Sequence, residues 1–499
     1  MLKTLCLLAV LQSSNPDSVL FIDSNVAIDS AYQLRLDDKA AEAVMLLDLI
    51  NEEDSNYYEA QADALSILND SDRPDETIQR SKKLILQPNE KMDEIYLLYG
   101  NAYLKKGALD SAKSVYDKGL DLYPYHHVFL YNKGIVFYRQ NELDEAEKWF
   151  KQALLINPFY SSAHLMLGHI SILKGHRTKG LMSYMVYLFL DEDANSALVT
   201  IDNLTNDAIR YEGSNLAGGN VFEQYDNLLK SRAAFDDRFK YKTQFNAPIV
   251  KQFELLSSKL KPQSGDDFWE AYYLPLFLKI KDNNLAETTL YYILTSTGKE
   301  EVMEWLEKNS KLTDQWLDIV NGELYRWRDK HEAMVLGEKN VYDFWYYDNN
   351  DINAIGNENA AEDKVGSWVF FYDNGQTSAI GKYNEEGYKI GDWKYYFENG
   401  RLSREEYYDD NGDVSAPFIY YREDGSKATE VPYKDNDVEG IVKYYNSFNH
   451  VREETTYSKG QAEGKGQTFY KSGAKNIEYQ MSEGKLNGAY MLYHETGST

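Results

Sequence analysis

The chain contains very few of the residues that build disulfides, metal sites and rigid loops. Its 499 residues include one cysteine, eight histidines and ten prolines. A single cysteine excludes an intrachain disulfide and a zinc site made of several thiolates. No two histidines have the His-x-x-x-His spacing of a helical metal site, so we expect neither a metal ion nor any other cofactor.

Positive charge is also scarce, with 53 lysines and arginines against 80 aspartates and glutamates, a formal net charge of -27. Because a nucleic-acid-binding protein needs a basic face to displace counterions, we do not expect a nucleic-acid partner. The sequence also lacks a phosphate-binding loop, a dinucleotide fingerprint and a nucleophile elbow, so we expect a protein that is not an enzyme. No run of about 20 apolar residues is present, which predicts no transmembrane segment.

The first residues resemble a short secretory signal peptide. Lys3 supplies one positive charge, a run of seven apolar residues follows from Leu5 to Leu11, and the small Ser13 and Ser14 come next. This pattern predicts a signal peptide over residues 1–14 and an exported protein of the periplasm or cell envelope. The alternative is the first helix of a cytoplasmic protein.

A repeated unit is clearest between positions 93 and 194. Small residues recur at two places in each unit, and proline closes two units: Gly100, Gly134, Gly168, Ala112, Ala146, Gly180, Pro124 and Pro158. Each unit predicts two antiparallel helices, because small residues let two backbones approach and proline ends a helix. The pattern resembles the tetratricopeptide repeat (TPR). The resemblance implies a right-handed α-solenoid over residues 25–195, with the best units at 93–126, 127–160 and 161–194.

The TPR resemblance implies a partner-binding groove lined by the first helix of each unit. The residues at groove positions are Leu97, Asn101, Lys105, Tyr131, Tyr138, Arg139 and His169. Asn101 and Asn132 match the asparagines of the TPR subclass that clamps a peptide carboxylate, but Leu97 and Met166 replace its basic residues. We therefore expect a protein segment in the groove but no capture of a C-terminal carboxylate, and we expect Asn132 to support hydrogen bonding between helices.

Residues 196–335 keep a helical pattern but lose the period, after a Gly/Asn-rich loop at Asn203–Asn220. They are either degenerate helix pairs that continue the solenoid or a separate helical bundle, and the regular polar breaks favour the first. Trp305, Trp316 and Trp327 are spaced 11 apart. This spacing places them on one face of a helix, which is typical of a core.

From residue 340 to residue 499 the apolar period changes to two, which predicts β-strands. Trp393, Tyr395 and Phe397 then share one side of a strand, and Asn399-Gly400 predicts a two-residue hairpin turn with positive φ angles. Related turns and unit starts recur at nearly even intervals: Asn374-Gly375, Asp424-Gly425, Phe448-Asn449, Ser472-Gly473 and Thr496-Gly497, with Gly366, Gly391, Gly440, Gly464 and Gly488. We expect a long twisted ribbon of six or seven antiparallel hairpins.

This β repeat resembles the MORN-repeat variant of bacterial YwqK-family antitoxins, through the core Gly391, Trp393, Tyr395, Tyr396, Asn399 and Gly400. The last unit stops after Gly497 without a return strand, so we expect a sequence truncated near Thr499. The repeats together predict a protein–protein interaction scaffold of the bacterial cell envelope, with the TPR groove and the β ribbon binding separate partners. The alternatives are an antitoxin or immunity-type protein, which follows from the YwqK resemblance, and a glycan-binding envelope protein using the aromatic ladder.

Overall fold

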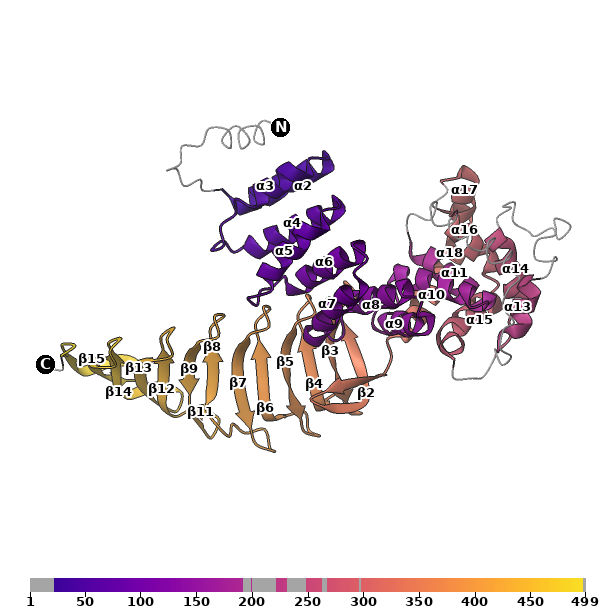
Figure 1. The fold of residues 1–499 in the computed structure, drawn as a ribbon. Helices are drawn as coiled ribbons and strands as arrows, with labels where there is room; N and C mark the ends of the chain where they lie inside the picture. The colour runs from indigo at the N-terminus through magenta and orange to yellow at the C-terminus, as the bar shows by residue number, and fades with distance from the viewer. Residues whose placement is uncertain are drawn as a thin grey trace. The chain divides into compact units, whose positions relative to one another are not determined.

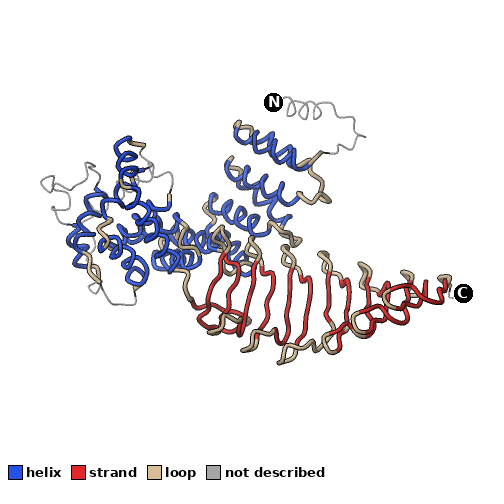
Figure 2. Tube along the Cα trace, turned by 180° about the vertical axis from the view of Figure 1, so that it is seen from behind, coloured by secondary structure: helices blue, strands red, loops and turns tan. Residues whose placement is uncertain are grey.

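The computed structural model describes residues 22–191, 199, 221–230, 248–262, 267–295 and 298–496. Within these residues, helices occur up to Arg326 and strands follow from His331 (Figure 1). The predicted fold class is confirmed, because helix pairs of a TPR solenoid precede a large antiparallel β-sheet (Figure 2). The chain forms two compact units, one from Met1–Pro124 and Glu332–Thr499 and the other from Tyr125–His331. The predicted signal peptide over 1–14, the loop Asn203–Asn220 and the last residues 497–499 lie outside the described residues.

The helices of the first unit form the consecutive pairs α2/α3, α4/α5 and α6/α7. Their bounds are α2 Ser24–Leu36, α3 Ala40–Leu47, α4 Tyr57–Asp70, α5 Pro74–Leu84, α6 Met92–Lys105 and α7 Leu109–Leu122. In α6/α7 the approach of the two helices depends on Gly100, because a Cβ atom there would lie 2.1 Å from the ring of Tyr116. The small residue is therefore required by the aromatic ring that covers it.

The second unit begins with two further pairs, α8 His127–Arg139 with α9 Leu143–Ile156, and α10 Ser161–Leu173 with α11 Arg177–Leu190. The same contact recurs in both. A Cβ atom would lie 2.7 Å from the ring of Phe150 at Gly134 and 2.3 Å from the ring of Tyr184 at Gly168. Phe150 and Tyr184 are fully buried, so each glycine seats the main aromatic side chain of its helix pair.

The remaining described helices lie in the second unit without the period of the repeats. They are α13 Glu223–Lys230, α14 Pro248–Lys259, the π-helical turn η2 Trp269–Tyr273, α15 Leu274–Asp282, α16 Ala286–Ile293, α17 Glu300–Lys308 and α18 Ser310–Arg326. Their description as degenerate solenoid units stays a prediction. The expected single helix through Trp305, Trp316 and Trp327 is wrong, because α17 ends before Asn309. Trp316 and Trp327 are core residues, whereas Trp305 is only half-buried and stacks on Tyr291.

His164 of α10 joins this helical region to the repeats. Its Nε2 lies 2.8 Å from the carbonyl oxygen of Pro158, so Nε2 carries a hydrogen and donates it. Its Nδ1 then accepts a hydrogen bond from the Tyr273 hydroxyl at 2.6 Å. The neutral ring packs against Trp327 with a centroid distance of 5.5 Å. Burial lowers the pKa of His164 to about 4.

Fourteen strands form one sheet in which each strand pairs with the next along the chain, while the short β10–β11 hairpin stands between β9 and β12. The bounds are β1 His331–Val335, β2 Glu338–Tyr346, β3 Ile352–Glu358, β4 Lys364–Phe371, β5 Thr377–Tyr383, β6 Lys389–Tyr396, β7 Leu402–Tyr408, β8 Phe418–Tyr421, β9 Lys427–Val431, β10 Tyr433–Lys434, β11 Asp437–Val438, β12 Gly440–Tyr445, β13 Val451–Ser458, β14 Gln461–Phe469, β15 Lys475–Ser482 and β16 Lys485–Leu492. The ribbon of hairpins is thus confirmed, whereas its membership of the MORN family stays a prediction.

Glycines also make room for two tryptophan side chains of the sheet. A Cβ atom at Gly356 or Gly381 would lie 2.2 Å from the ring of Trp368 or Trp393 on the neighbouring strand. Both tryptophans are 1% exposed. Their indole N–H groups donate to backbone carbonyl oxygens of the strand beneath, at 3.1 Å and 3.0 Å. Each ring therefore lies flat across the backbone of its neighbour and forms a core within one layer.

The two faces of the sheet differ in chemistry. Residues opposite one another on neighbouring strands share a face. One face, here called the aromatic face, carries Trp368, Trp393 and Tyr395. The opposite face carries paired charges: Lys394 is opposite Glu405, and Lys443 is opposite Glu430. A slip of one residue would exchange the two faces, so this pattern specifies the register.

The hairpin loops differ from the expected two-residue turn. Phe397 N–H donates to Arg401 O and Gly400 N–H donates to Phe397 O, both at 2.8 Å, which closes a three-residue loop over 398–400. Only Gly400 has a positive φ, 79°. The Asn399 side chain accepts from Arg401 N–H at 3.0 Å and so fixes the turn before the glycine. Asn449 takes the glycine position of the degenerate copy with a φ of 61°.

Tyrosine hydroxyls at these loops join one hairpin to the next. Each hydroxyl donates to a backbone carbonyl of the following unit: Tyr347 to Phe371 at 2.7 Å, Tyr372 to Tyr396 at 2.7 Å and Tyr470 to Tyr493 at 2.9 Å. The sheet therefore has side-chain hydrogen bonds between units in addition to its backbone ladder.

Gly381→Ala should destabilise the sheet around β5 to β7 by about 1–3 kcal/mol, because the added methyl group overlaps the Trp393 ring. Native-state hydrogen exchange on the full chain measures this as faster exchange in these strands. Gly322→Ala is the control, since a Cβ atom there meets nothing within 4 Å and alanine favours α18 by up to about 1 kcal/mol. Unchanged exchange in the Gly381 variant would contradict the packing described.

The second unit should lose stability in acid through His164. The pKa of this histidine is about 4 in the fold and about 6.5 in an unfolded chain, so the unfolded state binds the proton first as the pH falls. This difference removes about 3 kcal/mol of unfolding free energy between pH 6.5 and pH 4. The free energy of unfolding, measured with urea at a series of pH values, should depend less on pH in His164→Gln than in the unchanged protein. His450→Gln, at an exposed loop residue, is the control.

Candidate functional site

Three of the predicted groove residues lie on α6 in the first unit. Leu97 and Asn101 are half-buried and Lys105 is exposed. The side-chain oxygen of Asn101 accepts a hydrogen bond from the Tyr116 hydroxyl of α7 at 2.7 Å. The ammonium group of Lys105 donates to the backbone carbonyl of Asn69 on α4, which fixes this lysine between two helix pairs.

The other four predicted groove residues lie on α8 and α10 in the second unit. The Tyr138 hydroxyl and His169 Nε2 are 2.7 Å apart, and their rings meet edge to face at a centroid distance of 5.5 Å. Burial raises the pKa of Tyr138 and lowers that of His169. Tyr131 packs against Tyr160 at 5.1 Å, while Arg139 is exposed. The structure thus brings Tyr138 and His169 together as a half-buried aromatic pair beside an exposed cation.

The charge pattern of the sheet contains a site that the sequence analysis did not single out. Glu406 is 4% exposed on the aromatic face, where it stands opposite Trp393. It accepts hydrogen bonds from the hydroxyls of Tyr395 at 2.8 Å and Tyr408 at 2.9 Å. The repeat pattern does mark this residue, because Glu406 takes the position that Gly381 holds in the preceding unit.

Two cations complete the surroundings of Glu406. Lys389 Nζ lies 3.2 Å and Arg404 Nε 3.0 Å from its carboxylate oxygens. The Arg404 guanidinium also lies over the Tyr395 ring, 4.0 Å from its centroid. Burial and the neighbouring Glu406 carboxylate raise the pKa of Tyr395, so its hydroxyl stays protonated and donates. Two hydroxyls and two cations therefore surround the buried carboxylate.

A hollow of about 440 Å³ opens next to this cluster on the sheet. Aromatic residues of three consecutive units line it together with Arg404, Ser378 and Ser403: Tyr372, Tyr395, Tyr396, Phe397, Tyr420 and Tyr421. We call it the tyrosine hollow. Tyr395, Arg404 and Tyr420 stand side by side across β6, β7 and β8, as the strand register requires.

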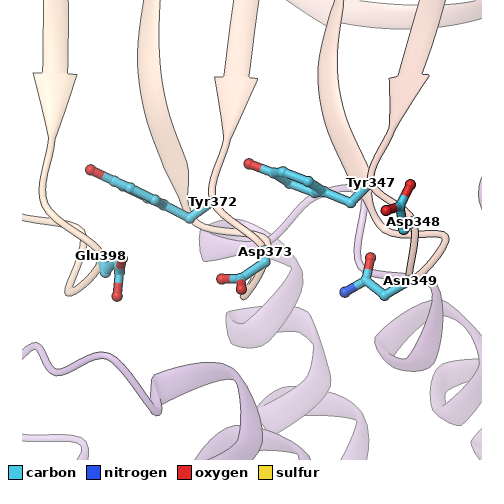
Figure 3. A pocket seen from close by; sticks show the side chains of 6 residues that line it. All are labelled: Tyr347, Asp348, Asn349, Tyr372, Asp373 and Glu398. Carbon is cyan, nitrogen blue, oxygen red and sulfur yellow. The ribbon is translucent and has the colours of Figure 1, made fainter.

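A second hollow, of about 460 Å³, lies at the hairpin loops. Figure 3 shows its lining, in which the Tyr347 and Tyr372 rings run parallel and three carboxylates, Asp348, Asp373 and Glu398, come from the same place in successive loops. Within the residues that the structure describes, no group of three or more His, Cys, Asp or Glu side chains is placed to hold a metal ion. Among these residues, no helix is both long and apolar enough to cross a membrane.

Glu406→Gln should destabilise the strands β6 and β7 by about 2 kcal/mol, because Lys389 and Arg404 lose their anionic partner in a half-buried site. Hydrogen exchange of these strands at neutral pH measures the change. Glu398→Gln at an exposed loop position should leave exchange unaltered and serves as the control. Equal behaviour of the two variants would show that the cluster contributes nothing to stability.

Comparison with known proteins identifies the helical repeats. Residues 93–126 and 128–160 each match the tetratricopeptide-repeat family. RNA polymerase II-associated protein 3 of Mus musculus is 30% identical over 123 residues, which is 25% of this chain and 16% of the mouse protein. The chain therefore spans about a sixth of that relative.

Two crystal structures are also similar to part of the chain. A MamA structure is 18% identical, with a TM-score of 0.28, over 34% of this chain and 95% of that one. A thermophilic TPR protein of Thermus thermophilus is 18% identical, with a TM-score of 0.32, over 36% of this chain and 98% of that one. The family matches establish that residues 93–160 of this chain are tetratricopeptide repeats, a fold that typically binds other proteins.

Proposed function

We propose that this protein is a non-enzymatic scaffold of a bacterial cell envelope, in which the TPR helices bind a segment of one protein and the sheet binds a second partner. The observation that carries the proposal is the pair of TPR matches, whose first helices α6 and α8 keep Lys105 and Arg139 exposed. Repeat arrays of this kind present extended surfaces to a partner.

The predicted partner segment is at least partly acidic or polar. Arg139 is an exposed cation on a chain whose net charge is -27, so it offers local attraction to an acidic segment. The half-buried pair of Tyr138 and His169 adds aromatic surface with polar edges, which is typical of protein interfaces. The signal-like pattern of residues 1–14 supports an envelope location.

Charge reversal tests the groove. The full-length protein, crosslinked in its native cells and recovered by affinity, should lose at least fivefold of its captured partner in Arg139→Glu. Lys148→Glu is the matched control, because Lys148 is an exposed cation on α9, the second helix of the same pair. Equal capture by both variants would contradict binding through the first helices.

Fractionation of the same cells tests the location. We expect the protein with the periplasmic or envelope fraction. Recovery in the cytoplasm would refute the envelope assignment. A cytoplasmic protein that captures one small toxic protein, independently of Arg139, would favour the antitoxin alternative instead.

A further inference from the structure

We infer that the tyrosine hollow is a binding site for a neutral saccharide. The hollow measures about 440 Å³, within the range of small-molecule sites and sufficient for one or two sugar rings. This inference specifies the second partner in the proposed function, and it does not depend on what the TPR helices bind.

Aromatic side chains supply the apolar part of the site. The Tyr395 and Tyr420 side chains stand on either side of Arg404 in the strand register, and Tyr372 and Phe397 close the hollow toward the hairpin loops. A pyranose ring presents an apolar face of C–H groups that packs on an aromatic ring. The Tyr395 ring is covered by the Arg404 guanidinium, so Tyr372, Phe397 and Tyr420 offer the stacking surfaces, from three consecutive hairpins.

Two serine hydroxyls supply unused polar groups. The strand register shifts by one between Tyr395 and Tyr396 on β6, and Ser403 on β7 is left without an opposite residue. Ser378 on β5 has the equivalent position one unit earlier. Both serines line the hollow, and among the described residues neither hydroxyl has a hydrogen-bond partner. A hydroxyl both donates and accepts, which matches the hydroxyl groups of a sugar.

The charges of the hollow and of the chain together favour a neutral ligand over an anionic one. Arg404 is the cation in the lining, and its Nε lies 3.0 Å from the buried Glu406 carboxylate. Its charge is thus partly offset by a carboxylate that Lys389 also shares, and its other N–H groups remain for hydrogen bonds. With a net charge of -27, the chain as a whole repels a polyanion. A neutral saccharide satisfies the rings, the hydroxyls and this charge balance together.

The shape of the hollow favours a saccharide over a protein. A stable protein interface requires more than about 1,000 Å² with an apolar core. The hollow is small, and its serines and tyrosine hydroxyls distribute polar groups throughout the lining. Tyr372 also borders the hollow at the hairpin loops, so a ligand of several sugar units has aromatic surface beyond the first ring.

Filling the hollow tests the inference. Full-length protein is titrated by calorimetry with maltohexaose, cellohexaose and chitohexaose, and with heparin as an anionic comparison. We expect at least one neutral hexasaccharide to bind and heparin not to bind. Ser403→Phe should weaken that binding at least tenfold. Ala428→Phe is the matched control, because Ala428 is the unpaired residue at the same place one unit later and lies outside the lining.

Ser378→Phe fills the same hollow from another strand and replaces Ser403→Phe if that variant does not fold, as judged by hydrogen exchange. Failure of all three neutral probes to bind would overturn the inference, as would equal weakening by Ala428→Phe. Heparin binding lost in Ser403→Phe would identify an anion site and also overturn it. These outcomes leave partner capture through Arg139 unaffected, so the two proposals fail separately.

Discussion

An aromatic ring seated on a glycine is the contact on which both halves of this protein depend. In the helical repeats it joins the two helices of a pair, as at Gly134 and Phe150. In the sheet it joins neighbouring strands, as at Gly381 and Trp393. The geometry differs, but the physical reason is the same: removing one side chain lets a large ring contact backbone directly, and dispersion and burial then act over its whole face. Two unrelated repeat architectures solve the same problem, because neither a lone helix pair nor a single-layer sheet can bury much surface by itself.

The periodicity of the sequence was enough to predict most of the fold. The glycines and prolines of the helical repeat mark the helix pairs where the structure has them, and the even spacing of the turns marks the hairpins. The type of hairpin turn and the ends of individual helices could not be predicted from the sequence. Asn399-Gly400 is compatible with a two-residue turn, but the side chain of Asn399 stabilises a three-residue loop. The spacing of Trp305 and Trp316 suits one helix, yet the chain breaks at Asn309, and propensity alone does not show where tertiary packing ends a helix.

The contacts within the candidate sites also could not be predicted from the sequence alone. Resemblance places Tyr138 and His169 in a groove, and the structure adds that they bond to each other, which their separation in the sequence does not reveal. Glu406 is the opposite case, since a departure from the repeat marks it. A carboxylate replaces a glycine in an aromatic row, and β6 and its own strand β7 provide the hydroxyls and cations around it. Such a residue is recognised only when the register of the sheet is known, because partners such as Tyr395 and Lys389 lie on a different strand.

The tyrosine hydroxyls at the hairpin loops have a consequence for how the sheet varies in length. Tyr347 and Tyr372 each donate to a backbone carbonyl of the following unit, an acceptor that does not depend on the side chain there. A unit that carries such a tyrosine thus brings its own donor and accepts through a group that all residues have, whereas Phe397 at the same loop position has no hydroxyl. Gene duplication of a hairpin unit that carries this tyrosine would leave the new junction hydrogen-bonded without compensating substitutions. The number of hairpins, and with it the length of the sheet, can therefore change in evolution by one unit at a time.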